Sequence, residues 1–239
     1  MRVAALYDIH GNLPALEAVL EEVEGVDAVV VGGDVASGPM PAETLGALRS
    51  MGDRVHFVRG NADRVLDLDG IPEPNRSARL WVAEQLEEEA LAFLANLPLG
   101  LALDVDGLGA VRFCHGAPGS DETTITAVTS DERLRRLLAG MEEDIVVCGH
   151  THIQFDRWLD GVRVLNAGSV GAPYEAEPAA YWLELGPEVR FRRTDYDIEA
   201  ALEQMRATGY PNLEPSLEYL SPDPDRPDRM SALIEEQWR

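Results

Sequence analysis

Four of the five histidines in this chain of 239 residues lie in three short motifs, each directly after an apolar run typical of a buried strand. They are His10, His115 and the pair His150 and His152, whereas His56 lies outside the motifs. Imidazole is the commonest protein ligand for metals, and α/β sheets build their sites where strands end. The histidines therefore predict a metal centre, in which His150 and His152 serve either one ion or two adjacent ions.

Oxygen ligands occupy the same kind of position along the chain. Asp8, Asp34 and Asn61 each follow an apolar run, and Asp8 lies two residues before His10. Residues i and i+2 of an extended chain point to the same side, so Asp8 and His10 can reach one ion. Together the motifs offer seven nitrogen and oxygen donors. These are too many for one tetrahedral ion but suit two ions held about 3.5–4 Å apart by a bridging carboxylate.

The first motifs are positioned by a β-α-β-α-β alternation, which indicates parallel strands joined by crossover helices. Asn12 is the expected N-cap of the first helix, and Pro14 lies in its first turn. We predict strands at 2–7, 26–31 and 55–58, and helices at 14–24 and 41–51.

The remainder of the chain is predicted to contain a long helix at 77–96 and then mostly hairpins. The hairpins turn at 106–107, 160–161 and 186–187. We predict further strands at 99–105, 110–114, 144–148, 153–159, 162–165, 179–185 and 189–194, and helices at 131–140, 198–207 and within the last ten residues. No strong boundary divides the chain, so we predict a single domain over 1–239, with a helical insert at about 71–96 and a C-terminal tail at about 211–239.

The large negative net charge limits the kinds of molecule that the protein can bind. The chain has 43 acidic and 20 basic residues, a net charge of −23. Binding of nucleic acid depends on neutralising phosphates with basic side chains, so we expect no nucleic-acid surface. A small anionic substrate can still bind where metal cations supply positive charge. The sequence has no apolar stretch of about 20 residues and no secretory signal, which predicts a cytoplasmic protein away from membranes. Its oligomeric state is not predicted.

Cys114 and Cys148 are the only cysteines, and each ends an apolar strand shortly before a motif histidine. We interpret both as small buried residues packed below the site. A role as metal ligands is the alternative.

The order of the motifs resembles that of the calcineurin-like metallophosphoesterase superfamily, whose signature is D-x-H, G-D, G-N-[HC]-[DE], H-G and G-H-x-H. The corresponding segments here are Asp8-Ile9-His10, Gly33-Asp34, Gly60-Asn61-Ala62-Asp63, His115-Gly116 and Gly149-His150-Thr151-His152. The chain is most similar to the compact bacterial and archaeal phosphodiesterase branch, because residues 166–169 resemble the N-P-G-S element of that branch. The resemblance extends to about residue 194 and leaves the tail unmatched.

The resemblance implies an α/β fold, a four-layer αββα sandwich of two mixed β-sheets flanked by helices. It implies that one metal is bound by Asp8, His10, Asp34 and His152, and the other by Asp34, Asn61, His115 and His150. Asp34 then bridges the ions and positions the metal-activated hydroxide that attacks the phosphorus. The N and O ligands fit Mn²⁺ or Fe²⁺/Fe³⁺ best, with Zn²⁺ or Ni²⁺ as alternatives.

One position departs from the family pattern. Many members place a histidine after Gly-Asn, to protonate the leaving oxygen or stabilise the transition state, and this chain has Ala62 there. A general acid is typically worth about 10²–10⁴ in rate, so Ala62 predicts slow turnover of alkyl monoesters. Asp63, which would orient that histidine, is expected to fix the loop from outside the ligand shell. His56 is a possible substitute acid, although its strand position favours a structural role.

Four residues near the motifs are candidate substrate contacts: Asn12, Asn61, Arg59 and Arg64. For both arginines, an ion-paired or solvated role is the stronger interpretation. We expect the helical segment between about 71 and 96 to overhang one side of the site and to shape substrate choice.

We hypothesise a dinuclear-metal phosphoesterase acting on a small phosphodiester or phosphomonoester, with the diester favoured. The alternative that is not an enzyme is a binding or scaffold protein that retains the metal but has little activity. A dinucleoside-polyphosphate hydrolase is a further alternative, whereas a phosphoprotein phosphatase is disfavoured because its relatives keep the histidine that is Ala62 here.

Overall fold

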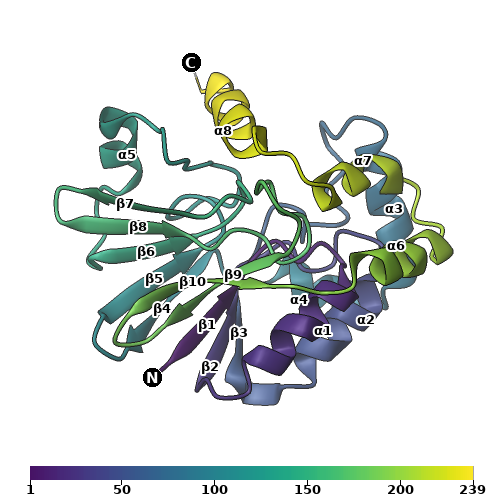
Figure 1. The fold of residues 1–239 in the computed structure, drawn as a ribbon, viewed down its shortest axis with the longest axis horizontal. Coiled ribbons are helices and arrows are strands. Elements are labelled where there is room, and N and C mark those ends of the chain that lie inside the picture. The colour runs from purple at the N-terminus through teal and green to yellow at the C-terminus, as the bar shows by residue number, and fades with distance from the viewer. Residues whose placement is uncertain (239) are drawn as a thin grey trace.

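Two five-stranded β-sheets pack face to face in the computed structural model, with helices on their outer faces (Figure 1). The structure describes residues 1–238, and of residues 215 and 216 it describes only the backbone. The first sheet has the order β10-β9-β1-β2-β3 and the second the order β4-β5-β6-β8-β7. The strands of the first sheet are β1 (Val3–Leu6), β2 (Ala28–Val31), β3 (Val55–Phe57), β9 (Ala180–Leu185) and β10 (Val189–Thr194). Those of the second are β4 (Gly100–Val105), β5 (Gly109–Cys114), β6 (Ile145–Cys148), β7 (Phe155–Leu159) and β8 (Val162–Asn166).

Helices complete a four-layer αββα arrangement, as the family resemblance implied. The helices are α1 (Leu13–Glu22), α2 (Pro41–Arg49), α3 (Asn75–Gln85), α4 (Glu88–Ala95), α5 (Asp131–Leu137), α6 (Ile198–Ala207), α7 (Leu213–Leu217) and α8 (Arg226–Glu236), with single 3₁₀ turns at Gly52–Arg54 and Glu218–Leu220. Side chains of α1, α2, α3 and α4 pack on the outer face of the first sheet. Leu134 of α5 packs against Val146 and Val164 on the outer face of the second.

Both sheets are mixed. β1, β2 and β3 are parallel, as the β-α-β-α-β alternation predicted. The hairpin formed by β9 and β10 joins the antiparallel side of β1, where Leu185 pairs with Val3. The mixed first sheet agrees with the two mixed sheets that the family resemblance implied. The outer edge of β1 needs a partner, and the last hairpin supplies it.

Side chains along β1 point alternately to the two faces of the first sheet and therefore pack in two different hydrophobic cores. Ala4 and Leu6 face the helices, whereas Val3 and Ala5 face the second sheet. All four residues are fully buried, which explains why the strand is apolar throughout instead of alternating with polar residues. Directly after β1, the Tyr7 hydroxyl donates a hydrogen bond across the sandwich to the Val147 carbonyl on β6, at 3.0 Å. This contact fixes the end of β1 relative to the second sheet.

The long helix predicted over 77–96 is two helices, so that prediction was wrong. The chain is extended at Leu86 and Glu87, between α3 and α4. Three consecutive glutamates from Glu87 to Glu89 lie at the start of α4, where the positive end of the helix dipole favours them. The break also buries the Leu86 side chain in the core. Burial and helix-end electrostatics together outweigh helical continuity.

The tail crosses the molecule as two short helices, α7 and α8, with the second 3₁₀ turn between them. α7 lies beside α3 (Figure 1), and the Asn212 amide before α7 donates to Asn75 Oδ1 at 3.1 Å. α8 starts at Arg226, earlier than the predicted helix of the last ten residues. It docks near α5, where Glu235 accepts from Thr126 Oγ1 at 2.8 Å and pairs with Arg133 at 3.2 Å. The tail therefore packs against both the insert and the α5 region.

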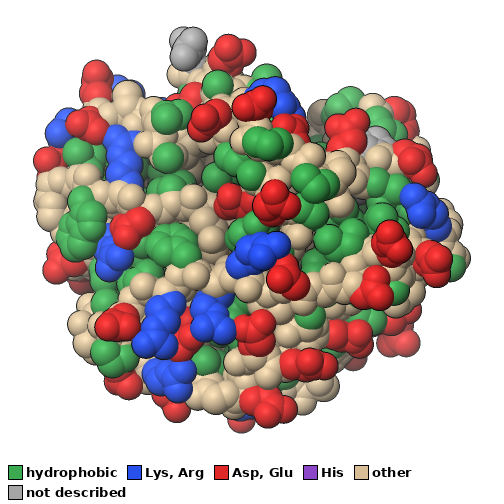
Figure 2. Space-filling model, viewed as in Figure 1, with side chains coloured by type: hydrophobic (Ala, Val, Ile, Leu, Met, Phe, Trp, Pro, Cys, Tyr) green, Lys and Arg blue, Asp and Glu red, His purple; other side chains and the backbone are tan. Residues whose placement is uncertain are grey.

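Surface charges are mixed, and acidic side chains occur across the face shown in Figure 2. Three arginines lie on β10, and each is paired with an acidic side chain. Arg190 pairs with Glu188, Arg192 with Glu22, and Arg193 with Asp195. Among the described residues, no helix combines the length and apolarity that crossing a membrane requires.

Candidate metal centre

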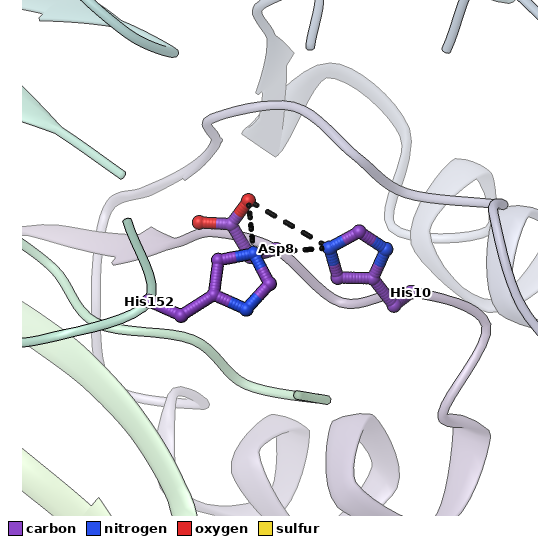
Figure 3. Close-up of side chains that lie close together, drawn as sticks. All are labelled: Asp8, His10 and His152. Carbon is purple, nitrogen blue, oxygen red and sulfur yellow. Dashed lines mark hydrogen bonds and ion pairs between the residues drawn. The ribbon is translucent and has the colours of Figure 1, made fainter. Parts of the chain in front are cut away.

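The carboxyl ends of strands from both sheets deliver the first set of donors. Asp8 and His10 follow β1, and His152 follows β6. Their nitrogen and oxygen atoms converge on one point (Figure 3). His152 Nε2 lies 3.4 Å from Asp8 Oδ1 and 3.2 Å from His10 Nε2, and His10 Nε2 lies 3.9 Å from Asp8 Oδ1. The structure thus brings together three of the four predicted ligands of one ion.

A second set forms beside the first. Asp34 follows β2, His115 follows β5 and His150 follows β6. His115 Nε2 lies 3.5 Å from Asp34 Oδ2, 3.1 Å from His150 Nδ1 and 3.2 Å from Asn61 Oδ1. These are the four residues predicted to hold the other ion.

Asp34 lies between the two sets. Its Oδ2 is 3.5 Å from His115 Nε2 and 3.7 Å from His10 Nε2, so one oxygen reaches both groups. Its Oδ1 accepts a hydrogen bond from the Ala62 amide at 2.8 Å, which fixes the carboxylate plane. This geometry suits the predicted bridging role.

Backbone carbonyls set the tautomer of all four histidines. In each of these rings, one nitrogen lies within hydrogen-bond distance of a backbone carbonyl oxygen. His10 Nδ1 lies 3.2 Å from the oxygen of Ser37, and His115 Nδ1 lies 2.9 Å from that of Gly32. His150 Nε2 lies 3.2 Å from the oxygen of Glu122, and His152 Nδ1 lies 2.5 Å from that of Ala172. A carbonyl only accepts hydrogen bonds, so that ring nitrogen carries the proton. The other nitrogen of each neutral ring then directs a lone pair toward the centre.

These lone pairs identify the ligand that fits. The inward nitrogens of His10 and His152 face each other, as do those of His115 and His150, with no proton to share. Asp8 Oδ1 is fully buried and has no hydrogen-bond partner. Converging lone pairs around a buried carboxylate oxygen repel one another unless a cation lies among them. The donors of the two groups therefore fit divalent metal ions.

The charges shift the proton equilibria of the ligands in both directions. Burial opposes protonation of His115 and His152, but the neighbouring carboxylates, Asp34 for His115 and Asp8 for His152, raise the pKa values of these two rings. Burial opposes ionisation of Asp8, but the surrounding histidines, His152 first, hold the pKa of its carboxyl below the usual range. Burial, and then the neighbouring His115, lower the pKa of His150 to about 4. Carboxylate and neutral imidazole are the forms that bind metals.

The backbone is strained at the ligands. Six described residues other than glycine have a positive φ, and five of them are predicted ligands, with φ between 48° and 64°. These five are Asp8, His10, Asp34, His150 and His152. A left-handed conformation costs such residues roughly 1 kcal/mol or more each and persists where the surroundings enforce it. The tight turns aim side chains that a relaxed strand would direct elsewhere.

A second layer of polar groups holds these turns. Asp63 accepts three backbone hydrogen bonds, from Asp34 at 2.9 Å, Val35 at 2.9 Å and Gly60 at 2.8 Å. Burial, and then the Asp34 carboxylate, raise the pKa of Asp63 to about 7, although the N–H groups oppose this shift. Asp63 thus ties the loop after β3 to the loop after β2, which fits the expectation that it fixes the loop.

Residues 166–169 hold the other side of the site. The Asn166 amide donates to the Gly149 carbonyl at 2.7 Å, and the Ser169 hydroxyl donates to the Asp8 carbonyl at 2.7 Å. Both cysteines are buried in the core beneath, and burial raises the pKa of Cys114 to about 12. Neither cysteine belongs to the described donor groups, so their interpretation as packing residues is confirmed.

A cavity of about 430 Å³ opens directly onto the donors. Ala62 and Arg79 of α3 both line it. Arg79 donates to the carbonyls of Asn61 at 3.3 Å, Arg64 at 3.0 Å and Asp67 at 2.8 Å. Among the described residues it is the one basic side chain that lines this cavity. No sequence motif marks it, and its position on the insert is the only signal that could have found it.

The predicted substrate contacts have mixed outcomes. Arg59 and Arg64 both pair with Asp121, and neither lines the cavity, so the ion-paired interpretation is confirmed. His56 lies on β3 and also does not line the cavity. Asn12 caps α1 through the Ala15 amide, as predicted. It lines the cavity, but its amide donates to the Gly171 carbonyl and the Tyr196 hydroxyl, so a contact with substrate stays a prediction.

Comparison with known proteins identifies the class. Residues 1–185 match the model of the calcineurin-like phosphoesterase superfamily domain. The chain therefore belongs to this superfamily of metal-dependent phosphoric ester hydrolases, as the order of its motifs predicted.

Individual relatives support the assignment. A metallophosphoesterase from Sphaerobacter thermophilus is 28% identical and has a TM-score of 0.74, over 92% of this chain and 98% of that one. The hypothetical protein PH1004 from Pyrococcus horikoshii shares the fold, with a TM-score of 0.80 at 22% identity over 92% and 98% of the two chains. The phosphodiesterase YfcE of Escherichia coli is 27% identical over 192 residues, which are 76% of this chain and 85% of that protein.

Gly60→Ala should weaken metal binding about 10- to 100-fold, the effect typical of disturbing groups that support a ligand. A Cβ at this position would collide with Oδ1 and the backbone nitrogen of Asp34. Calorimetric titration with Mn²⁺ measures the change. Gly46→Ala on α2 is the matched control, because its Cβ meets no atom within 4 Å. Unchanged affinity in Gly60→Ala would contradict the role of Asp34.

Asp63→Ala should lower the free energy of unfolding of the metal-free protein by about 1–3 kcal/mol, because three backbone N–H groups lose their acceptor. Urea unfolding measures this change, and the affinity for Mn²⁺ should fall as well. Asp69→Ala removes an exposed carboxylate nearby and should leave both quantities unchanged. Equal stability of the two variants would show that Asp63 does not hold the loops.

Proposed function

We propose that this protein is a dinuclear-metal phosphoesterase that hydrolyses a small phosphodiester. The observation that carries the proposal is the pair of adjacent donor groups with the Asp34 carboxylate between them. Asp8, His10, Asp34 and His152 would hold one ion, and Asp34, Asn61, His115 and His150 the other. Bound there, two divalent ions supply Lewis-acid chemistry, which activates a water and offsets charge on the phosphoryl oxygens. Nitrogen and oxygen donors favour manganese or iron, and we place the enzyme in the cytoplasm.

The protein's own groups then keep the reacting atoms in place. The carbonyls that bind the outer ring nitrogens stop the imidazoles from rotating, so the inward lone pairs stay aligned. Asp63 holds the backbone of Asp34 by accepting from its N–H, and the Ala62 amide donates to the Asp34 carboxylate. Such fixed geometry lowers the reorganisation needed in the transition state.

Ala62 supports a diester with a good leaving group. An alanine methyl cannot protonate the departing oxygen, and the histidines that line the cavity, His10, His150 and His152, are all predicted metal ligands. Without a general acid, a group that leaves readily as an anion is favoured.

Arg79 is the protein group best placed to meet the phosphate. Three of its five N–H groups donate to carbonyls, which leaves two for a substrate oxygen. It lies on the cavity wall that carries Asn61 and Ala62. We therefore assign to Arg79 the role that the sequence had suggested for Arg59 and Arg64.

Hydrolysis of bis-p-nitrophenyl phosphate with Mn²⁺ tests the function. Asp34→Asn and His115→Ala should each abolish turnover, because each removes a donor at the centre of the site. Activity that survives both substitutions would sink the two-metal mechanism. Bound metal without turnover of any phosphodiester, phosphomonoester or dinucleoside polyphosphate would favour the metal-retaining scaffold.

Arg79→Ala should lower kcat/KM for the diester about 10- to 100-fold, the usual worth of a hydrogen bond to a charged group. Because Arg79 also binds the Asn61 carbonyl, metal content is measured in the same samples. Added guanidinium should restore part of the activity if the lost contact was with phosphate. Arg59→Ala removes an arginine outside the cavity and serves as the control. A loss that follows metal content and resists rescue would refute the phosphate contact.

A further inference from the structure

The cavity extends beyond the metal centre to residues of the insert and the tail, and we call this part, whose lining is mostly apolar and aromatic, the chamber. One wall comes from the insert and the other from α6, α7 and the 3₁₀ turn that follows. Its apolar lining includes Ile71, Ala78, Met205, Tyr210, Leu213 and Leu220. The contributions from α6 onward lie outside the residues that match the family domain. One wall of the chamber is therefore built by the part of the chain that follows the matched domain.

Aromatic rings connect the chamber with the metal centre. The Tyr174 ring stacks on His152, with centroids 4.7 Å apart and planes at 24°. Tyr219 follows at 4.8 Å from Tyr174. Tyr210 is fixed edge-on against Trp81 of α3, at 5.4 Å. A molecule with its phosphate at the donors therefore meets apolar and aromatic surface on its way into the chamber.

One buried arginine holds the aromatic wall in place. Arg226, at the start of α8, is only 5% exposed. Its guanidinium donates to the carbonyls of Glu175 at 3.1 Å, Glu218 at 2.8 Å and Ser221 at 2.8 Å. Two of these carbonyls belong to the residues next to Tyr174 and Tyr219. The chamber is thus preformed, which reduces the entropy that a ligand must lose on binding.

The walls define what the chamber can hold. Apolar and aromatic side chains around a few polar groups are typical of pockets that bind flat organic rings, since rings stack and bury apolar area without losing hydrogen bonds. A second phosphate or a bare sugar would gain little from the apolar and aromatic part of this lining. The Asn75 amide, on the same cavity, offers donors to a ring edge.

We propose that the chamber binds a planar ring on one ester group of the substrate, so that the enzyme acts on aryl or nucleoside phosphodiesters. The inference rests on the proposed function, because it takes the phosphate to bind at the metal centre. The ring group is the ester that stays on the phosphate, and the other ester oxygen leaves as an alcohol or phenol when water adds to phosphorus.

Three substrates with the same leaving group separate ring recognition from the metal chemistry. They are the methyl, phenyl and thymidine 5′-esters of p-nitrophenyl phosphate, assayed with the Mn²⁺-loaded protein. Apolar contacts of this size are worth about 10- to 200-fold in kcat/KM, so we expect at least a tenfold preference for a ring ester over methyl. Preference for phenyl alone identifies an aryl ligand, and preference for thymidine as well identifies a nucleoside. Either preference supports the proposal.

Leu213→Ala should lower the ring-to-methyl ratio of kcat/KM about tenfold, because this side chain lines the chamber. Leu217→Ala is the matched control, a leucine on the same helix that packs in the same cluster but does not line the cavity. Ala78→Phe fills the chamber from the insert and should lower the ratio too, which keeps the test valid if Leu213→Ala unfolds.

Equal kcat/KM for all three esters would overturn the ring site and leave the proposed function standing. No turnover of any ester by metal-loaded protein would instead refute the proposed function. In that case, calorimetric titration with thymidine 5′-monophosphate against methyl phosphate still tests the chamber. Tighter binding of the nucleotide, lost in Leu213→Ala but kept in Leu217→Ala, supports the ring site, and equal binding of the two ligands rejects it.

Discussion

The carbonyl contact on the outer nitrogen of each histidine is the constraint on which the rest of the site depends. It fixes the proton on one side of the ring and leaves a lone pair on the other, so that four rings aim lone pairs at two adjacent points. Such an arrangement is unfavourable unless cations compensate it. The turns with positive φ, the glycines beside them and the acceptor groups of Asp63 all hold this arrangement in place. The strained strand ends thus lower the stability of the fold locally, and the apolar core between and behind the sheets offsets this loss.

The two-sheet architecture makes this arrangement possible. Neither sheet alone carries a complete ion site, because the ligands after β1 and β2 meet those after β5 and β6 across the sandwich. The hydrogen bond from Tyr7 to Val147 is one of the contacts that keeps the two sheets in register at this end. A shift of one sheet relative to the other would therefore separate donors within both groups.

The residues of the metal centre could be predicted from the sequence better than the residues that line the cavity. Strand ends are recognisable because an apolar run stops at Asp8, Asp34 or His115, and parallel pairing brings such ends to one edge. Sheet order was harder, because no local pattern shows that the last hairpin pairs with β1. The break at Leu86 was missed because helical propensity continues through it, and only burial favours the extended conformation. Arg79 and Tyr174 carry no motif, since long-range packing alone decides that they face the centre.

The docking of the tail determines the order in which the site can be assembled during synthesis. All seven predicted ligands lie within the first 152 residues, whereas the far wall of the cavity includes residues 205–220, and Arg226 and Glu235 anchor the segment that follows. The growing chain therefore contains all of its predicted ligands before the residues of the far wall are made. The ligands are held only once β9, Ser169 and Ala172 have followed them, so the centre and the far wall are completed by successive parts of the chain.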